Sequence, residues 1–229
     1  MSLSQRKQGA GVPFSADARA RLAALLVQGS ETMGVPLDEA TRSHLLDYLA
    51  LLHRWNSTYN LTAVREPEQM VIRLLLDSLS IVPYIKGPAT VLDIGTGAGL
   101  PGIPLALARP DLEVTLLDSN RKKTRFLVQA VGALCEAGAD ISVVTERVEH
   151  YRPPRSFDAV VSRAFSSLGE LAEVAAPLCR RGGRLMAMKS RSAEAELAAL
   201  PAGWRLLGME PLSVPGLDAE RCLVILERE

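Results

Sequence analysis

Long apolar runs are missing from this chain, and cysteine and histidine occur only three times each. No stretch reaches the roughly 20 apolar residues that span a bilayer, and no apolar segment follows the basic residues near the N-terminus, which argues against a secretory signal. Cys135, Cys179 and Cys222 form no C-x-x-C pair. Scattered cysteines fit a reducing compartment and argue against a disulfide framework or a metal site. We therefore expect a cytoplasmic protein that neither enters a membrane nor holds a metal.

The chain also has no net charge, since 26 Lys and Arg residues balance 26 Asp and Glu residues. The charges are unevenly distributed, because residues 120–192 contain 13 basic and 7 acidic side chains. Contact with phosphates depends on a local basic face rather than on the total charge. The sequence thus permits a nucleic-acid partner, although solvated helix faces explain the same excess.

The first 88 residues predict helices without strands. We expect residues 1–14 to be disordered and residues 15–88 to form an N-terminal helical region. A helix over 15–29 begins at Ser15 as N-cap, a second begins after Pro36, and a third runs from Pro67 to about residue 84. Residues 56–60 interrupt the apolar stripe of the second helix and are expected to form a loop.

From residue 89 onward, apolar strands alternate with helices, which predicts a mostly parallel sheet and a domain spanning 89–229. At the end, two strands follow each other without a helix, so we expect an antiparallel hairpin there. The expected strands are 90–94, 113–117, 141–145, 158–162, 184–189, 204–210 and 221–227. The expected helices between them are 101–109, 121–137, 167–180 and 192–200.

The most informative segment is TVLDIGTGAGLPGIP at residues 90–104. A strand that runs into a glycine-rich turn brings backbone N–H groups close to a ligand. The next strand ends in Asp118, whose carboxylate is suitably placed to bind the two hydroxyls of a ribose. Together these features indicate a nucleoside cofactor.

The residues favour S-adenosylmethionine over a nicotinamide dinucleotide. The segment from Gly97 to Gly102 matches G-x-G-x-x-G, but Pro101 removes an N–H that a pyrophosphate would use. The carboxylate of Asp93 would repel a pyrophosphate and suits an amino group or a sulfonium. After the third strand, Val148-Glu149 offers an apolar contact and a polar partner for adenine, although Glu149 also fits a solvated helix end.

Several segments together resemble the RsmG (GidB) family of methyltransferases, and the likeness extends from about residue 45 to the end. The segments are WN at 55–56, YNLT at 59–62, LDS at 76–78, DIGTGAGLPGIPLA at 93–106, LLDSNRKKTRFL at 116–127, FDAVVSRAF at 157–165 and GGRLMAMK at 182–189.

The resemblance implies a class I, Rossmann-like fold and methylation of N7 of guanine 527 in bacterial 16S ribosomal RNA. It also implies S-adenosylmethionine as cofactor, bound by residues that include Gly95, Leu100, Asp118, Val148, Glu149 and Arg163. With Asp93 and the other residues of the glycine-rich turn, the expected cofactor-binding set is Asp93, Gly95, Thr96, Gly97, Gly99, Leu100, Asp118, Val148, Glu149 and Arg163. The sequence departs from the family at Leu74, where a histidine usually follows the arginine that is Arg73 here, and this departure leaves any role of that histidine unassigned.

An N7 acceptor agrees with what the chain lacks. Guanine N7 has a free lone pair and no proton, so no general base is required. The sequence has neither the [DN]-P-P-[YF] segment of amino methylation nor a Pro-Cys nucleophile. Cys179 follows Leu178 in an expected helix and is interpreted as structural, and Arg163 is the one residue considered for a catalytic role.

The expected partner is 16S ribosomal RNA or the small ribosomal subunit, bound by a monomer. Basic residues after the second and fifth strands are candidates for RNA contact: Arg121, Lys122, Lys123, Arg125, Lys189 and Arg191. Alternative roles stay open for two residues: an ion pair of Arg163 with Asp93 or Asp118, and a plain surface position for Lys189. Two other functions also stay open, a non-catalytic ribosome-assembly factor with a vestigial cofactor fold and a nicotinamide-dependent oxidoreductase.

Overall fold

The computed structural model describes residues 14–229 except 88, 135–136, 164, 166 and 191–192. The expected disorder of residues 1–14 therefore lies outside the described residues, apart from Phe14. Seven strands form one sheet in the order β3-β2-β1-β4-β5-β7-β6. Their bounds are Ala89–Ile94 (β1), Leu112–Asp118 (β2), Asp140–Thr145 (β3), Phe157–Ser162 (β4), Cys179–Lys189 (β5), Trp204–Pro211 (β6) and Cys222–Arg228 (β7).

The sheet is parallel from β3 through β5, and β7 runs antiparallel to both of its neighbours, β5 and β6. The predicted mixed sheet with a terminal hairpin is thus confirmed. Helical elements precede and connect the strands. They are Ala16–Thr32 (α1), Glu39–Tyr59 (α2), Pro67–Met70 (α3), the π-helix Val71–Leu76 (η1), Asp77–Leu79 (α4), the 3-10 helix Val82–Tyr84 (η2), Gly102–Ala108 (α5), Arg121–Ala133 (α6), Leu168–Ala175 (α7) and Glu194–Leu197 (α8).

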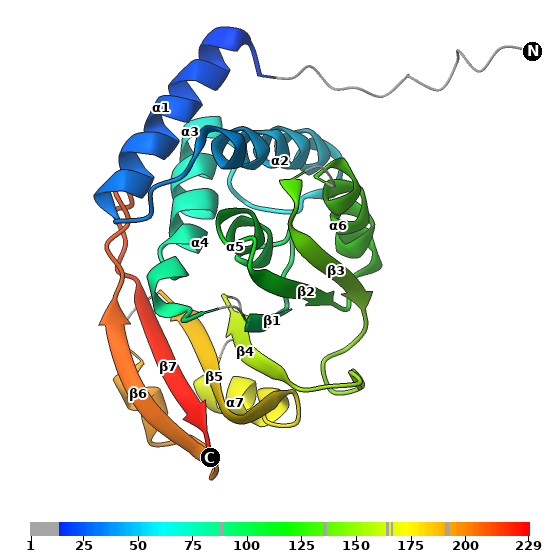
Figure 1. The fold of residues 1–229 in the computed structure, drawn as a ribbon, viewed down its shortest axis with the longest axis vertical. Helices are drawn as coiled ribbons and strands as arrows, with labels where there is room; N and C mark the ends of the chain where they lie inside the picture. Colours follow the sequence, from blue (N-terminus) through cyan, green and yellow to red (C-terminus); the bar gives the residue numbers. More distant parts are fainter. Residues whose placement is uncertain (1–13, 88, 135–136, 164, 166, 191–192) are drawn as a thin grey trace, which may run out of the picture.

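Alternation along each strand divides the interior into two layers, as expected for a sheet covered on both faces. In β1, Val91 packs with the helices α1, α2, α5 and α6, whereas Leu92 and Ile94 pack with α7 on the other face. Figure 1 shows α2, α4, α5 and α6 gathered on one side of the sheet and α7 on the other. The same alternation directs Asp93, two residues after Val91, toward the α5 face.

The first two helices, α1 and α2, begin where capping side chains satisfy their first N–H groups. Ser15 accepts from the backbone N–H of Ala18, as predicted, and Asp38 accepts from that of Thr41. The loop expected at 56–60 is wrong, because α2 continues to Tyr59 and ends at Asn60 in the left-handed conformation. Asn56 does not break the helix, since its buried side chain makes its hydrogen bonds with the loop that follows.

A second correction concerns Cys179, which was expected in a helix. The helix α7 ends at Ala175, two residues before Pro177, and Cys179 is instead the first residue of β5, where it pairs with Phe157. Pro177 has no backbone N–H to continue the helical hydrogen-bond ladder, which explains the early end. Cys179 is fully buried, and burial raises the pKa of its thiol to about 12.

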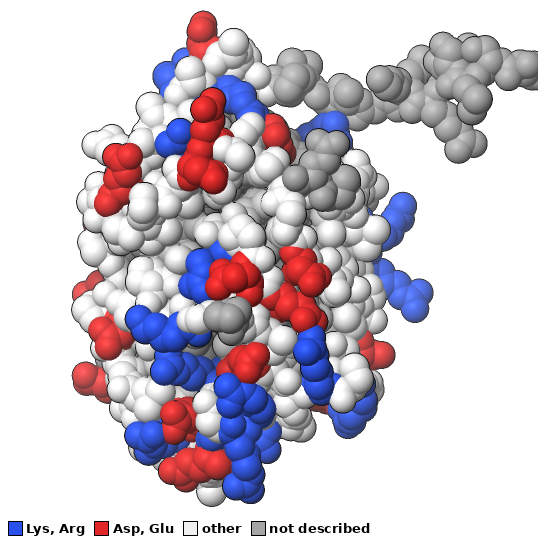
Figure 2. Space-filling view, viewed as in Figure 1, with Lys and Arg blue, Asp and Glu red and all other residues white. Residues whose placement is uncertain are grey.

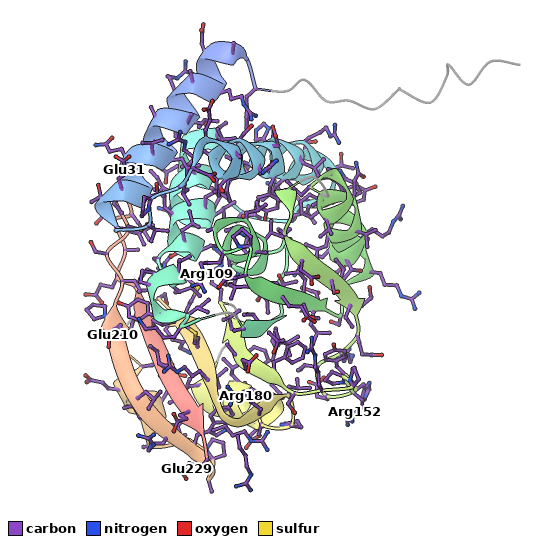
Figure 3. The ribbon with its side chains drawn as sticks, in the orientation of Figure 1. Glu31, Arg109, Arg152, Arg180, Glu210 and Glu229 are labelled. Atoms are coloured by element: carbon purple, nitrogen blue, oxygen red, sulfur yellow. The ribbon has the colours of Figure 1, made fainter. Side chains whose placement is uncertain are left out.

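Arg109, which follows α5 and is labelled in Figure 3, links the segment before β1 to the segment before β2 at the amino ends of these strands. Its guanidinium donates to the carbonyls of Ile85 and Gly87 at 3.0 and 2.8 Å and pairs with Asp111 at 2.7 Å. These contacts are structural. Ligands of such sheets bind at the opposite edge, beyond the carboxyl ends of the strands. Among the described residues, no helix is both long and apolar enough to cross a membrane.

Candidate active site

The glycine-rich turn between β1 and α5 opens toward the carboxyl edge of the sheet. The N–H groups of Gly95 and Thr96 bond to the carbonyl of Leu117 in the neighbouring strand β2, at 2.9 and 3.2 Å. Gly95 has a φ of +67°, and a Cβ added there would meet nothing within 4 Å. A ligand can therefore approach the backbone closely at this residue. At Gly99 a glycine is required by packing, because a Cβ there would lie 2.5 Å from the side chain of Ile103.

Asp93 is a fully buried carboxylate at the base of this turn. Its Oδ2 accepts from the Thr96 hydroxyl at 2.6 Å and from the N–H of Gly102 at 2.8 Å, while its Oδ1 has no hydrogen-bond partner. Burial raises the pKa of Asp93 to about 7, and the hydrogen bonds and the positive charge of Arg163 oppose that shift. An unpaired buried carboxylate oxygen is costly unless a ligand supplies a donor.

Asp118, the last residue of β2, lies beside the turn as the sequence predicts. Its Oδ2 accepts from the N–H of Gly97 at 2.9 Å, and its Oδ1 accepts from the N–H of Asn120 at 2.8 Å. The ammonium of Lys123 is 3.6 Å from Oδ2. The carboxylate is thus held in position by the backbone of two separate loops.

One pocket of about 180 Å³ joins several of the predicted cofactor residues. It is lined by Ile94, Gly95, Leu117, Asp118, Ser119, Glu146, Arg147, Val148, Glu149 and Phe165. The ends of β1, β2 and β3 therefore meet at one place, with an acid at Asp118 and an apolar wall at Val148. Phe165 was missed as a site residue, although it belongs to the SRAF segment that carries the resemblance.

Other predicted cofactor residues lie behind this pocket. Thr96 is buried and bonds to Asp93, and Leu100 is buried in the core with Gly99 close to Ile103. These residues pack inside the turn and do not line the pocket. Gly95 and the residues that follow β2 and β3 do line it.

A second, more basic pocket of about 280 Å³ lies at the carboxyl ends of β4 and β5. At its base Asp77, which is buried, pairs with Arg163 at 3.3 Å and with Arg221 at 2.9 Å. Arg163 also donates to the carbonyl of Arg73 at 3.1 Å. The lining is completed by Thr62, Val64, Leu74, Met188, Lys189 and Ser190. We refer to it as the arginine pocket.

This arrangement corrects the ion pair considered for Arg163, whose carboxylate partner is Asp77 rather than Asp93 or Asp118. The two pockets are adjacent in the sheet, since β4 neighbours β1 and the Ser162 hydroxyl donates to the carbonyl of Ile94 at 2.9 Å. Asp77 and Arg221 were missed as site residues. The LDS segment was a signal for Asp77, but no local pattern marks Arg221.

The predicted RNA-binding residues divide into two groups. Arg121, Lys122 and Arg125 are exposed on the first turns of α6, and basic side chains project from the side of the molecule where Figure 1 places α6 (Figure 2). Lys189 is instead nearly buried and pairs with Glu196 at 2.9 Å. Arg191 lies outside the described residues.

The fold and this site define a class I methyltransferase. TrmN from Thermus thermophilus matches with a TM-score of 0.52 and 19% identity, over 69% of this chain and 53% of that one. A predicted O-methyltransferase from Agrobacterium tumefaciens matches with a TM-score of 0.53 and 25% identity, over 67% of this chain and 79% of that one.

The sequence comparison is more specific. Residues 41–224 match the family model GidB, described as rRNA small subunit methyltransferase G, and the chain belongs to that family. The protein named ribosomal RNA small subunit methyltransferase G in Aromatoleum aromaticum is 49% identical over 90% of this chain and 99% of its own length. Its namesake in Pseudomonas aeruginosa is 50% identical over 89% of this chain and 94% of its own length.

Proposed function

We propose that this protein transfers a methyl group from S-adenosylmethionine to N7 of a guanine in 16S ribosomal RNA, acting as a monomer in the cytoplasm. The observation that carries the proposal is the meeting of two unlike pockets at one edge of the sheet. The first contains the glycine-rich turn and the carboxylate of Asp118, which suits a ribose, and the second is the arginine pocket. Relatives with about half of their residues identical are named as methyltransferases of small-subunit ribosomal RNA.

The residues of the first pocket fit this cofactor. The Asp118 carboxylate suits the two ribose hydroxyls, and Val148 and Phe165 offer apolar contact for an adenine ring. Glu149 offers an acceptor for its exocyclic amino group. The unpaired Oδ1 of Asp93 suits the amino group of the methionine portion. When bound, S-adenosylmethionine supplies an electrophilic methyl group on a sulfonium.

The arginine pocket suits a nucleotide acceptor. Guanidinium groups bind phosphate oxygens and the O6 edge of guanine through paired N–H donors. Because N7 needs no deprotonation, these residues do not have to act as a general base. Their task is to orient the guanine so that N7 lies in line with the methyl group. Orientation alone recovers about 7–11 kcal/mol of a bimolecular barrier. The major groove of A-form RNA is too narrow for side chains, so we expect an irregular or opened RNA element as substrate.

The proposal is tested with small ribosomal subunits that lack the modification and S-adenosylmethionine labelled with tritium in its methyl group. We expect label at N7 of one guanine of 16S ribosomal RNA, located by cleavage mapping. Label on another atom or another RNA would contradict the proposal. Tight binding of subunits without any transfer would support the assembly-factor alternative. Membership of a methyltransferase family argues against the oxidoreductase alternative.

A further inference from the structure

An exposed aromatic ring lies at the end of α2, beside the candidate site. Tyr59, the last residue of that helix, is 40% exposed, and its ring stacks on Trp55 with 5.0 Å between centroids and 29° between planes. Trp55 in turn meets the buried ring of Phe126 edge-on at 5.7 Å. Tyr59 is therefore a flat ring supported from behind by two others.

Tyr59 differs from the other large hydrophobic residues at the surface. Within the described part of the chain, those that are exposed are Tyr59, Val128, Leu206 and Leu207, so Tyr59 alone among them is aromatic. A ring that is stacked on one face and exposed elsewhere can stack with a further planar group. Unpaired nucleobases fill such a position, because each base has a flat face that stacks on an aromatic side chain.

The loop after Tyr59 connects this ring to the arginine pocket. Asn56 fixes the loop, since its Oδ1 accepts from the N–H of Thr62 at 2.9 Å and its Nδ2 donates to the carbonyl of Val64 at 3.3 Å. Thr62 and Val64 both line the arginine pocket. Thr62 follows Tyr59 by three positions, a span of at most about 11 Å.

Exposed cations occur in the loop after Tyr59 and on α6, the helix that carries Phe126. Arg65 donates to the side chain of Asn60, the residue after Tyr59, at 2.8 Å. On α6, Lys122 lies one helical turn before Phe126 and therefore on the same side of that helix, and it is exposed. An exposed aromatic ring together with exposed cations is the combination that binds single-stranded nucleic acid, in which cations contact phosphates and the ring contacts a base.

We propose that Tyr59, supported by Trp55, is a stacking platform for an unpaired base of the RNA near the guanine that is methylated. This inference rests on the proposed function, and it assigns the platform a role in binding RNA rather than in methyl transfer. The phenol hydroxyl is not required for stacking, whereas the aromatic ring is. The ring and the hydroxyl are therefore separable by substitution.

The test measures the dissociation constant for unmodified small ribosomal subunits with saturating S-adenosylhomocysteine, the demethylated form of the cofactor, so that no methyl transfer occurs during the measurement. We expect Tyr59→Leu, which keeps an apolar contact with Trp55, to weaken binding about 5- to 150-fold, the range for one stacked base. Tyr59→Phe is expected to bind within about twofold of the wild type. The matched control is Leu207→Ala, which removes another exposed apolar side chain, on β6. Unchanged thermal unfolding and cofactor affinity in Tyr59→Leu confirm an intact fold.

Ultraviolet crosslinking identifies what contacts the ring. Trypsin releases residues 55–65 as one peptide, because Arg54 and Arg65 border it. We expect this peptide to carry a ribonucleotide on residue 59. Equal subunit affinity of Tyr59→Leu and wild type, or a crosslink from residue 59 to a ribosomal protein, would overturn the platform. Tyr59-dependent binding without methyl transfer would keep the platform and overturn the proposed reaction instead.

Discussion

The hydroxyl of Tyr48 donates a 2.7 Å hydrogen bond to the carbonyl of Ala98, and both residues are buried. Tyr48 lies on α2 and Ala98 lies in the glycine-rich turn, so α2 contacts the turn directly. Burial raises the pKa of Tyr48, which keeps the hydroxyl protonated as a donor. The helix α2 thus supports the turn of the proposed cofactor site as well as covering the sheet.

Replacing Tyr48 by phenylalanine is expected to destabilise the protein by about 1–3 kcal/mol, because the Ala98 carbonyl loses its donor while staying buried. The same change is expected to weaken cofactor binding, since the turn loses an anchor. Urea unfolding and titration calorimetry measure the two effects. A variant with wild-type stability would show that water or another donor replaces the hydroxyl.

The Asp118→Asn substitution is expected to weaken binding of S-adenosylmethionine about 10- to 150-fold. A carboxylate makes charge-assisted hydrogen bonds worth about 1.5–3 kcal/mol, and the neutral amide loses that contribution. Asp111→Asn is the matched control, because Asp111 pairs with Arg109 at the opposite edge of the sheet. Equal affinities of the two variants, measured by calorimetry, would remove Asp118 from the site.

The affinity for S-adenosylmethionine is expected to rise between pH 6 and pH 8. Burial raises the pKa of Asp93 to about 7, so the acceptor form that suits an amino group increases over this range. The same shift predicts that the free protein loses stability as the pH rises from about 4 to 7, because the folded state then binds more protons than the unfolded state. Asp93→Asn is expected to remove both dependences. An affinity that is constant with pH in the wild type would contradict this assignment.

Asp77→Ala is expected to destabilise the protein by about 3–5 kcal/mol, because it leaves two guanidiniums without their shared carboxylate. The lower end is favoured, since Arg163 and Arg221 both reach solvent in part. Asp47→Ala breaks the exposed pair with Arg19 and is expected to cost about 0–1 kcal/mol. Chemical unfolding of both variants gives the comparison, and equal losses would mean that Asp77 makes no special contribution.

The features that sequence reasoning predicted correctly are encoded locally. The alternation of strands and helices, the glycine turn and the acid at Asp118 each depend on neighbouring residues and a fixed period. The errors in the fold, at Asn56 and Cys179, concerned where a helix ends, which depends on individual side-chain contacts and on a proline rather than on the apolar period. Asn56 looked like a helix breaker, but its side chain bonds to the loop beyond the helix end.

The arginine pocket was missed for a related reason. Asp77 and Arg221 are 144 positions apart, and an ion pair over such a separation leaves no periodic trace in one sequence. Arg221 opens the strand expected at 221–227, but nothing in that strand pattern marks its side chain as part of a site. Its role appears only when the sheet brings the start of β7 beside Asp77.

The position of β7 has a consequence for the order in which the protein is built. Synthesis runs from the amino end, so β5 and then β6 emerge before the strand that has to lie between them. Until β7 inserts, β6 has no partner in the sheet and Arg221 cannot reach Asp77. The glycine turn and Asp118 belong to earlier segments. The residues of the proposed nucleoside pocket are therefore translated before the arginine pocket can be completed, and β7 supplies its missing side.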